Sequence, residues 1–296
     1  VTGAEVAAIR SGPGGAEVDV RRGVDVRHGT GTRTLRARFV LAGVAPWILA
    51  GLLGEERDPA AKPTGAQLKV NFLLTRLPRL KSGADPRVAF AGTLHLSEDY
   101  SCLERAYEQA AAGRIPQRLP GEVYCHSLTD PSILGQVPDG FQTLTYFGLH
   151  LPASLFDDPA TRAERKELAV RRAIASLDEH LIDPIESVVA RDAAGRPCVE
   201  AKIPQDVEAD LGMPGGHIFH GDLSWPWASG DVSGDASGNV AADSPAARWG
   251  VSARQAGYVG QAGQERVLIC GSGAQRGGAV SGLGGHNAAH AVMELA

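Results

Sequence analysis

The sequence is short of aromatic residues and has no excess of positive charge. Aromatics make up 5% of the 296 residues, and the formal net charge at pH 7 is −5. Nucleic-acid-binding proteins use basic surfaces and aromatic stacking platforms, so these shortages argue against a nucleic-acid partner. No eighteen consecutive apolar residues occur, and no basic segment followed by an apolar one opens the chain. We therefore expect no transmembrane segment and no secretory signal.

Cysteine is also scarce, and its few copies follow no motif. The sequence contains no C-x-x-C pair, and the wide spacing predicts reduced, buried thiols rather than a disulfide framework. The four cysteines are Cys102, Cys125, Cys198 and Cys270. Lysine supplies only five of the 29 basic residues, and together with the 37 glycines this bias suggests a GC-rich bacterial gene. We expect a cytoplasmic protein and leave a peripheral association with a membrane open.

The sequence lacks a convincing metal site and a nucleophile motif. His217 and His220 are three positions apart, and His286 and His290 would share one face of a helix, but no carboxylate or cysteine with ligand spacing accompanies them. The G-x-S-x-G elbow of serine hydrolases is absent. We therefore predict no metal, expect ordinary hydrogen bonds for these histidines, and assign no side chain as a catalytic base.

The last thirty residues are the most informative part of the chain. Val267 to Cys270 has the composition of a buried strand, a glycine-dense loop runs to Gly285, and 287–295 is typical of a helix. A strand, a glycine turn and a helix bring backbone N–H groups and a helix N-terminus against an anionic or electron-rich ligand. The dinucleotide fingerprint G-x-G-x-x-G is incomplete, because Arg276 stands at the third glycine and no strand follows within the chain.

This glycine loop resembles a known family. Residues 271–282, GSGAQRGGAVSG, are similar to the C-terminal flavin-contacting loop of phytoene desaturase-like FAD-dependent oxidoreductases, which belong to the wider amine-oxidase-like flavoproteins. Residues 214–224, PGGHIFHGDLS, resemble the branch typified by pyridine nucleotide-disulfide oxidoreductase domain-containing protein 2. Looser matches at 2–6 and 39–46 extend the resemblance towards the start of the chain.

The resemblance implies FAD as the cofactor and a set of residues that would hold it. By its match, the backbone at Val6 would hold the adenine ring, and the N-terminus of the closing helix would stabilise negative charge on the pyrimidine side of the flavin. Many family members have His-Pro where this chain has Gln275-Arg276, so Arg276 either adds a cation near the flavin or turns to solvent. The implied cofactor-binding residues are Val6, Gly271, Ser272, Gly273, Arg276, Gly277, Gly278, Val280, Ser281 and Gly282.

The resemblance also implies a division of the chain and a reaction class. Residues 1–56 would be part of the FAD-binding domain, 57–247 the substrate-binding domain, and 248–296 the closing strand, loop and helix of the FAD-binding domain. The family's dinucleotide fingerprint lies upstream of the region matched here, so we expect a C-terminal portion of a longer enzyme that is inactive alone. Hydride would pass to the flavin from a small apolar or amphipathic substrate.

Two alternatives stay open at this point. An amine-oxidase-type flavoenzyme would oxidise a C–N bond, and Trp225 and Trp227 are the candidates for an aromatic cage beside the ring. A non-catalytic binding or assembly module would have kept the fold and lost the cofactor.

Hydrophobic periodicity predicts an α+β fold, with a mixed, largely antiparallel substrate-domain sheet flanked by helices, plus the remaining part of an FAD-binding α/β domain of GR2 type. A hairpin is expected to turn at Arg21, Arg22 and Gly23. Asp158 is expected to cap the clearest helix, 158–181, with Pro159 in its first turn. Strands are expected at 68–74, 88–94, 123–128 and 143–149, and further helices at 46–53 and 98–112.

Overall fold

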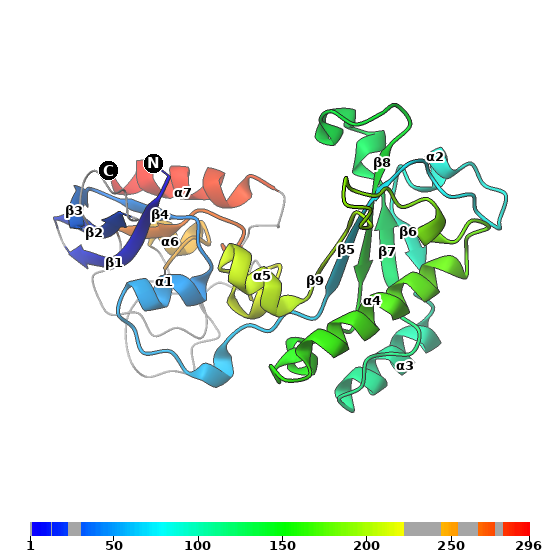
Figure 1. Cartoon of the computed structure of the whole chain (residues 1–296). Helices are drawn as coiled ribbons and strands as arrows, with labels where there is room; N and C mark the ends of the chain where they lie inside the picture. Colours follow the sequence, from blue (N-terminus) through cyan, green and yellow to red (C-terminus); the bar gives the residue numbers. More distant parts are fainter. Residues whose placement is uncertain (1, 13, 23–30, 222–243, 254–265, 276–280) are drawn as a thin grey trace. The chain divides into compact units, whose positions relative to one another are not determined.

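The computed structural model describes residues 2–12, 14–22, 31–221, 244–253, 266–275 and 281–296. The chain forms two compact units (Figure 1): unit 1 combines 1–63 with 217–296, and unit 2 is the continuous stretch 64–216. Both units mix helices with strands that are mostly antiparallel, which confirms the predicted α+β class. Among the described helices, none has the length and apolar character needed to cross a bilayer.

Unit 2 is built on a five-stranded antiparallel sheet with the order β6-β7-β8-β5-β9. Burial alternates along β5, where Leu68, Val70, Phe72 and Leu74 are buried and the residues between them are half-buried. The strands are β5 (Leu68–Leu74), β6 (Leu94–Leu96), β7 (Gly121–Tyr124), β8 (Gln142–Gly148) and β9 (Val199–Lys202). The helices are α2 (Pro86–Ala89), α3 (Tyr100–Ala111), α4 (Arg162–Asp178) and α5 (Pro204–Leu211).

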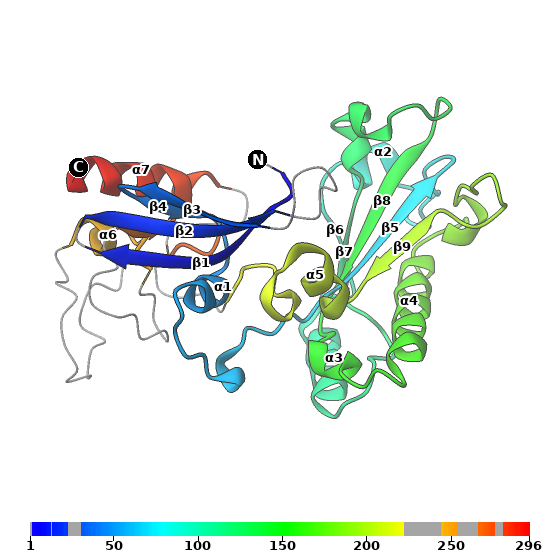
Figure 2. The same ribbon diagram turned by 60° about the vertical axis from the view of Figure 1, so that its left-hand side comes forward.

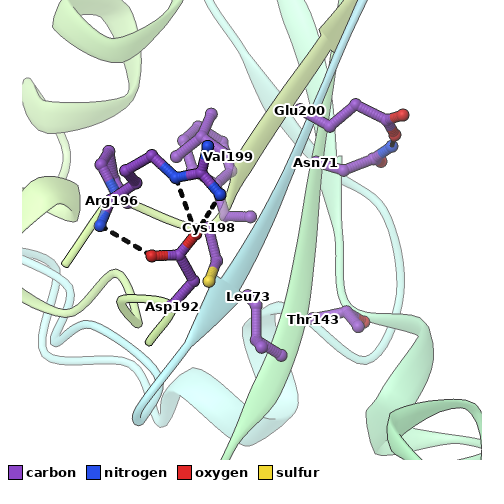
Figure 3. A pocket seen from close by; sticks show the side chains of 10 residues that line it. Asn71, Leu73, Thr143, Asp192, Arg196, Cys198, Val199 and Glu200 are labelled. Carbon is purple, nitrogen blue, oxygen red and sulfur yellow. Dashed lines mark hydrogen bonds and ion pairs between the residues drawn. The ribbon is translucent and has the colours of Figure 1, made fainter. Parts of the chain in front are cut away.

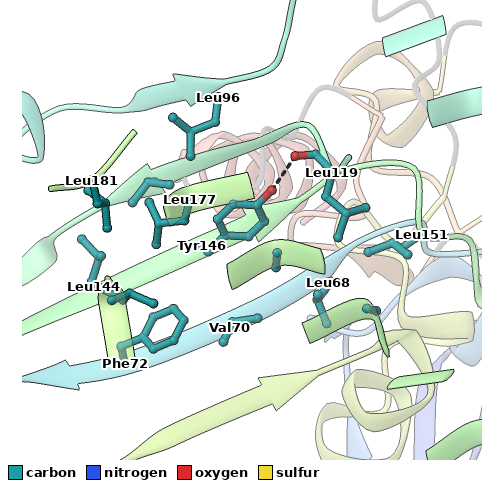
Figure 4. Close-up of a cluster of buried hydrophobic side chains, with 14 of the residues drawn as sticks. Leu68, Val70, Phe72, Leu96, Leu119, Leu144, Tyr146, Leu151, Leu177 and Leu181 are labelled. Atoms are coloured by element: carbon teal, nitrogen blue, oxygen red, sulfur yellow. Dashed lines mark hydrogen bonds between the residues drawn. The ribbon is translucent and has the colours of Figure 1, made fainter. Parts of the chain in front are cut away.

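One face of this sheet carries the hydrophobic core of unit 2 (Figure 4). Leu144 and Tyr146 on β8 are fully buried there, and Ala173 and Leu177 of α4 pack against the same cluster. The phenol of Tyr146 donates a hydrogen bond to the carbonyl of Leu119 at 2.7 Å, so its one polar group is satisfied inside the core. The opposite face, which we call the polar face, carries His95, Lys69, Asn71, Glu122, Tyr124, Thr145 and Phe147.

Three predictions for unit 2 are wrong in detail. The expected strand at 88–94 is replaced by α2 and the short β6, because Asp85 accepts a hydrogen bond from Arg87 N and Pro86 opens a helical turn. The strand predicted at 123–128 ends at Tyr124 and is followed by a 3₁₀ turn, His126–Leu128. Helix α4 begins at Arg162 rather than near Asp158, because the Asp158 carboxylate closes a separate local turn by accepting from Ala160 N at 2.9 Å.

Unit 1 contains two small sheets. The three-stranded antiparallel sheet β1-β2-β3 consists of β1 (Ala4–Gly12), β2 (Gly15–Arg22) and β3 (Thr32–Ala37), drawn as neighbouring arrows in Figure 2. The second sheet pairs β4 (Val40–Ala42) in parallel with β10 (Val267–Ile269). The helices are α1 (Pro46–Leu52), α6 (Pro245–Arg248) and α7 (Leu283–Leu295).

The structure corrects two further expectations. Arg21 and Arg22 do not form a turn: they are the last residues of β2 and pair with Glu5 and Ala4 of β1, while Gly23 lies outside the described residues. All four cysteines are free, but the expected burial holds for Cys102 and Cys125 alone, because Cys198 and Cys270 are half-buried.

The unit boundaries at 63/64 and 216/217 differ from the boundaries at 56/57 and 247/248 given by the sequence analysis. Residues beyond 56 stay with unit 1 because the Arg57 guanidinium lies 5.0 Å from the Trp47 ring centroid and donates to its carbonyl. The residues just before 248 also belong to unit 1, because Ser244 caps α6 and Ala246 of that helix is buried in the core of unit 1. The roles assigned to the three predicted segments stay predictions.

Candidate functional site

The carboxyl ends of two parallel strands and the N-terminus of a helix meet in unit 1. Register pairs Val267 with Val40 and Ile269 with Ala42, so β4 and β10 end at the same edge. The pairing continues one residue further, where Cys270 N donates to the Ala42 carbonyl at 2.9 Å. In open α/β sheets, ligands bind outside the carboxyl ends of parallel strands. This edge of the β4–β10 sheet is therefore the candidate ligand site of unit 1.

Glycines let three backbone segments approach closely at this edge. A Cβ on Gly284, in the first turn of α7, would lie 2.4 Å from the Gly271 carbonyl oxygen. A Cβ on Gly271 would lie 3.0 Å from the Gly43 carbonyl oxygen, and one on Gly273 would lie 2.7 Å from Pro46 Cδ. At these positions the absent side chain makes room for the protein itself, so these glycines are explained by packing.

Gly282 is different from these three. It is the N-cap residue of α7, with φ −74°, and no described atom lies within 4 Å of the position that a Cβ would occupy. As a glycine, Gly282 has no side chain with which to cap the helix, and the first turn contains no acidic residue. The first N–H groups of a helix carry partial positive charge. An electron-rich ligand group could therefore be accepted beside Gly282.

The far end of α7 is anchored by side chains. Trp249 Nε1 donates to Glu294 Oε1 at 2.8 Å, and Arg248 forms an ion pair with the same carboxylate. The hydrogen bond from Trp249 is the main reason that the pKa of Glu294 is lowered. The Trp249 ring also stacks on His290 with centroids 4.8 Å apart. His286 and His290 thus both lie against the Trp249 ring, with His286 6.4 Å from it between ring centroids, and the absence of a metal there stays a prediction.

His220 lies beside the glycine loop in a constrained conformation. Its φ is +65°, and its Nε2 lies 3.3 Å from the Ser272 hydroxyl. Burial, and secondly the neighbouring His217, lower the pKa of His220, which favours the neutral ring. Its Nδ1 is buried and has no hydrogen-bond partner among the described residues. The sequence analysis expected ordinary hydrogen bonds for this histidine, but no spacing signal could have placed it beside Ser272.

Unit 2 has a shallow depression of about 590 Å³ on its sheet (Figure 3). Asn71 donates to Glu200 at 3.0 Å, and Arg196 Nε donates to Asp192 at 2.9 Å, so polar groups around it already have protein partners. It is lined by Asn71, Phe72, Leu73, Thr143, Asp192, Arg196, Pro197, Cys198, Val199 and Glu200. The depression is wide open and offers a surface for contact rather than an enclosed reaction chamber.

Comparison with known proteins identifies relatives over almost the whole chain. The uncharacterized protein Rv0897c of Mycobacterium tuberculosis and Mb0921c of Mycobacterium bovis are each 49% identical over 296 residues, covering 99% of this chain and 50% of the relative. The rat protein named pyridine nucleotide-disulfide oxidoreductase domain-containing protein 2 is 27% identical over 278 residues, covering 89% of this chain and 42% of the relative. The mouse protein of that name is 26% identical over 231 residues, 76% of this chain and 34% of the relative.

The chain is a distant homologue of pyridine nucleotide-disulfide oxidoreductase domain-containing protein 2. The resemblance to that branch, predicted from residues 214–224, is confirmed at this level, whereas the more specific likeness to phytoene desaturases stays a prediction. No protein-family model matches the chain. The chain spans about half the length of the mycobacterial relatives it matches and less of the mammalian ones.

The structure brings some of the predicted cofactor-binding residues together. Gly271, Ser272 and Gly273 follow β10, and Ser281 and Gly282 precede α7, whose first turn returns to Gly271. Val6 lies on β1, 37% exposed and beside a register shift between Val6 and Ala8. Four predicted residues lie outside the described part of the chain: Arg276, Gly277, Gly278 and Val280. Trp225 and Trp227 also lie outside it. A role in cofactor binding stays a prediction for the whole set.

Proposed function

We propose that this chain is part of an FAD-dependent oxidoreductase and that unit 1 supplies one wall of the flavin site. The observation that carries the proposal is the convergence of the β4 and β10 carboxyl ends with the N-terminus of α7, whose N-cap residue is a glycine. The distant homology to proteins named as oxidoreductase-domain proteins supports the reaction class. Because the relatives are about twice as long, the activity belongs to the whole protein, and the chain alone is expected to be inactive.

The described residues fit a flavin at two points. No described atom lies within 4 Å of the position of a Cβ on Gly282, and an electron-rich group such as the flavin pyrimidine placed there would lie beside the positively polarised N-terminus of α7. The register shift after Val6 leaves Ala7 without a strand partner, which suits backbone hydrogen bonding to an adenine ring. FAD supplies the hydride acceptor when bound, and the chain orients it and compensates the charge that develops.

Unit 2 is proposed to bind the substrate. One face of its sheet is committed to the core, so substrate contact falls to the polar face. Lys69, Asn71 and Thr145 lie side by side across β5 and β8, and Thr145 donates to the Asn71 side-chain oxygen at 2.9 Å. Such a surface suits an amphipathic substrate with a polar group better than a wholly apolar one. The reaction proposed is dehydrogenation or isomerisation of that substrate.

The test is flavin binding, measured by visible absorption and by quenching of flavin fluorescence. The 296-residue chain is titrated with FAD, in parallel with a version that includes the coding sequence upstream of it. Stoichiometric flavin binding in the longer version supports a shared site. If neither version binds FAD, the oxidoreductase proposal fails and the non-catalytic binding module is the better description.

A matched pair of variants locates the site. Gly282→Leu fills the space beside α7, and Gly92→Leu makes the same change at an exposed glycine of unit 2, where no described atom lies within 4 Å either. Neither glycine has a left-handed φ, so both substitutions are free of backbone strain. Gly282→Leu is expected to weaken FAD binding by about ten-fold or more, equal to about 1.4 kcal/mol, whereas Gly92→Leu leaves it unchanged. Equal affinity in both would place the flavin elsewhere.

A further inference from the structure

Three side chains with metal-ligating atoms gather at the β6 edge of the unit 2 sheet. His95 on β6 pairs directly with Glu122 on β7, so their side chains lie on the same, polar face. Ser97 adopts φ +56° just after β6 and turns the chain so that Glu98 returns to His95. One ligating atom from each of His95, Glu98 and Glu122 lies within 4.8 Å of the others.

The charges in this cluster are not balanced by the rest of unit 2. His95 Nδ1 lies 2.5 Å from Glu98 Oε2, while the second oxygen, Oε1, is buried with no hydrogen-bond partner among the described residues. Within the described part of the chain, no lysine or arginine forms a salt bridge with Glu98 or Glu122. Two carboxylates therefore share this site with one imidazole, and Glu98 Oε1 lacks a donor.

We propose that His95, Glu98 and Glu122 bind a divalent cation, with Zn²⁺ as the ion that suits them best. Zn²⁺ is bound in proteins by imidazole nitrogen and carboxylate oxygen together, and three protein ligands are typical of zinc sites that keep an open position. Mg²⁺ and Ca²⁺ favour oxygen-only sets, so the imidazole selects against them. Two ligands of one tetrahedral Zn²⁺ lie about 3.3 Å apart, so small rotations of these side chains complete the site.

The position of the site indicates what the ion does. The His95 side chain is 55% exposed, which gives the ion a route from solvent and leaves room for a water or a substrate oxygen as fourth ligand. β6 is a three-residue edge strand, held in the sheet by β7 alone. A cation bound by His95, Glu98 and Glu122 fastens this strand, and the turn that follows it, to β7. Once the ion concentration exceeds the dissociation constant, the free energy of unfolding rises with the logarithm of the free ion concentration.

The test is calorimetric titration of the chelator-treated chain with Zn²⁺ alone, without flavin, so its outcome is independent of the FAD proposal. One ion per chain is expected. His95→Gln and Glu122→Gln should each weaken binding by at least the roughly 10- to 100-fold that loss of even an outer-shell partner costs. Matched controls are His126→Gln on a nearby turn and Glu104→Gln on α3, which should bind like the unaltered chain.

Melting curves without metal verify that all four variants fold like the unaltered chain. Zn²⁺ should then raise the melting temperature of the unaltered chain and of both controls, but not of the ligand variants. The proposal is overturned if the unaltered chain binds no stoichiometric Zn²⁺. It is also overturned if His95→Gln and Glu122→Gln retain full affinity, since the ion would then lie elsewhere, for example at His286 and His290.

Discussion

The two units differ in what fills their cores. The core of unit 2 contains Phe72, Phe90, Tyr146 and Phe156 with many leucines, and comes from one continuous stretch of chain. More than half of the described core residues of unit 1 are alanines, drawn from both ends of the chain: Ala16, Ala42, Ala246, Ala253, Ala274, Ala288 and Ala291. Large side chains stabilise unit 2, whereas unit 1 depends on close approach of backbones.

This difference in core composition predicts which substitutions each unit tolerates. Buried apolar area contributes about 25 cal/mol per Å², so a core of leucines and aromatics loses most when volume is removed. A core of alanine and glycine has little to lose by truncation, but it has no room for an added methyl group. Unit 2 is therefore sensitive to cavities and unit 1 to overpacking. The candidate flavin site lies in the unit whose backbone spacing must be exact to a fraction of an ångström.

The largest expected effect is that of a cavity in unit 2. Leu144→Ala removes a fully buried side chain from the centre of β8, and the free energy of unfolding should fall by about 2–5 kcal/mol. Hydrogen exchange of peptides from 142–148 in increasing urea measures the loss. Val88→Ala on α2, where the side chain is 74% exposed, is the control and should change little. Unchanged protection at β8 would show that the leucine core does not limit the stability of unit 2.

The counterpart in unit 1 is an added methyl group. Gly284→Ala places a Cβ 2.4 Å from the Gly271 carbonyl oxygen and should destabilise unit 1 by about 1–3 kcal/mol, despite the better helix propensity of alanine. Gly285→Ala is the matched control, because its Cβ meets Cys270 O at an ordinary 3.7 Å. That variant should be stabilised by up to about 1 kcal/mol.

Tryptophan fluorescence during urea unfolding measures this pair, because all four tryptophans belong to the segments of unit 1. The two substitutions should move the unfolding midpoint in opposite directions. A shift of the same sign and size in both variants would show that the close packing of α7 on the β10 loop does not determine the stability of unit 1.

An effect of similar size is expected from one polar group in the core of unit 2. Tyr146→Phe leaves the buried Leu119 carbonyl without its 2.7 Å hydrogen bond and should cost about 1–3 kcal/mol, with little change in packing. Tyr124→Phe on the half-buried polar face should cost less. The stability cost of each variant is measured from its urea midpoint, with unfolding followed by hydrogen exchange of peptides from 121–124 and 142–148. An equal cost for both would mean that the core bond adds nothing.

The smallest effect is a loss of stability in acid. Hydrogen bonds from Arg10 and Thr34 lower the pKa of Asp19 in unit 1 to about 2. The unfolded pKa is about 3.9, so the stabilisation is present above that pH and is lost as the pH falls towards 2. In unit 2, Arg79 and then Arg76 lower the pKa of Asp183, with the same sign. Asp19→Asn and Asp183→Asn should each flatten the dependence of unfolding on pH between about 4 and 2, measured by urea titration at each pH.

Local sequence patterns determined the elements with strong periodicity. The strand-like run 68–74 predicted the bounds of β5, the apolar run 267–270 predicted β10, and the helix expected at 98–112 contains α3, whose N-cap in the structure is Asp99. These signals are short-range, since they depend on side-chain alternation and on a cap next to the helix. They failed where two local signals competed, as at Asp158, whose carboxylate closes a turn before α4 instead of capping the helix.

Only the tertiary structure decided how residues far apart in the chain meet. The parallel pairing of β4 with β10 joins segments more than 220 positions apart, and no periodicity in either strand specifies that partner. The close approach of Gly284 to Gly271, the contact of His220 with Ser272 and the cluster of His95 with Glu122 follow from such pairings. The glycine loop led to the prediction of a ligand site, whereas strand register and backbone packing decide which side chains lie beside the described part of the loop, because these depend on contacts that a local pattern does not encode.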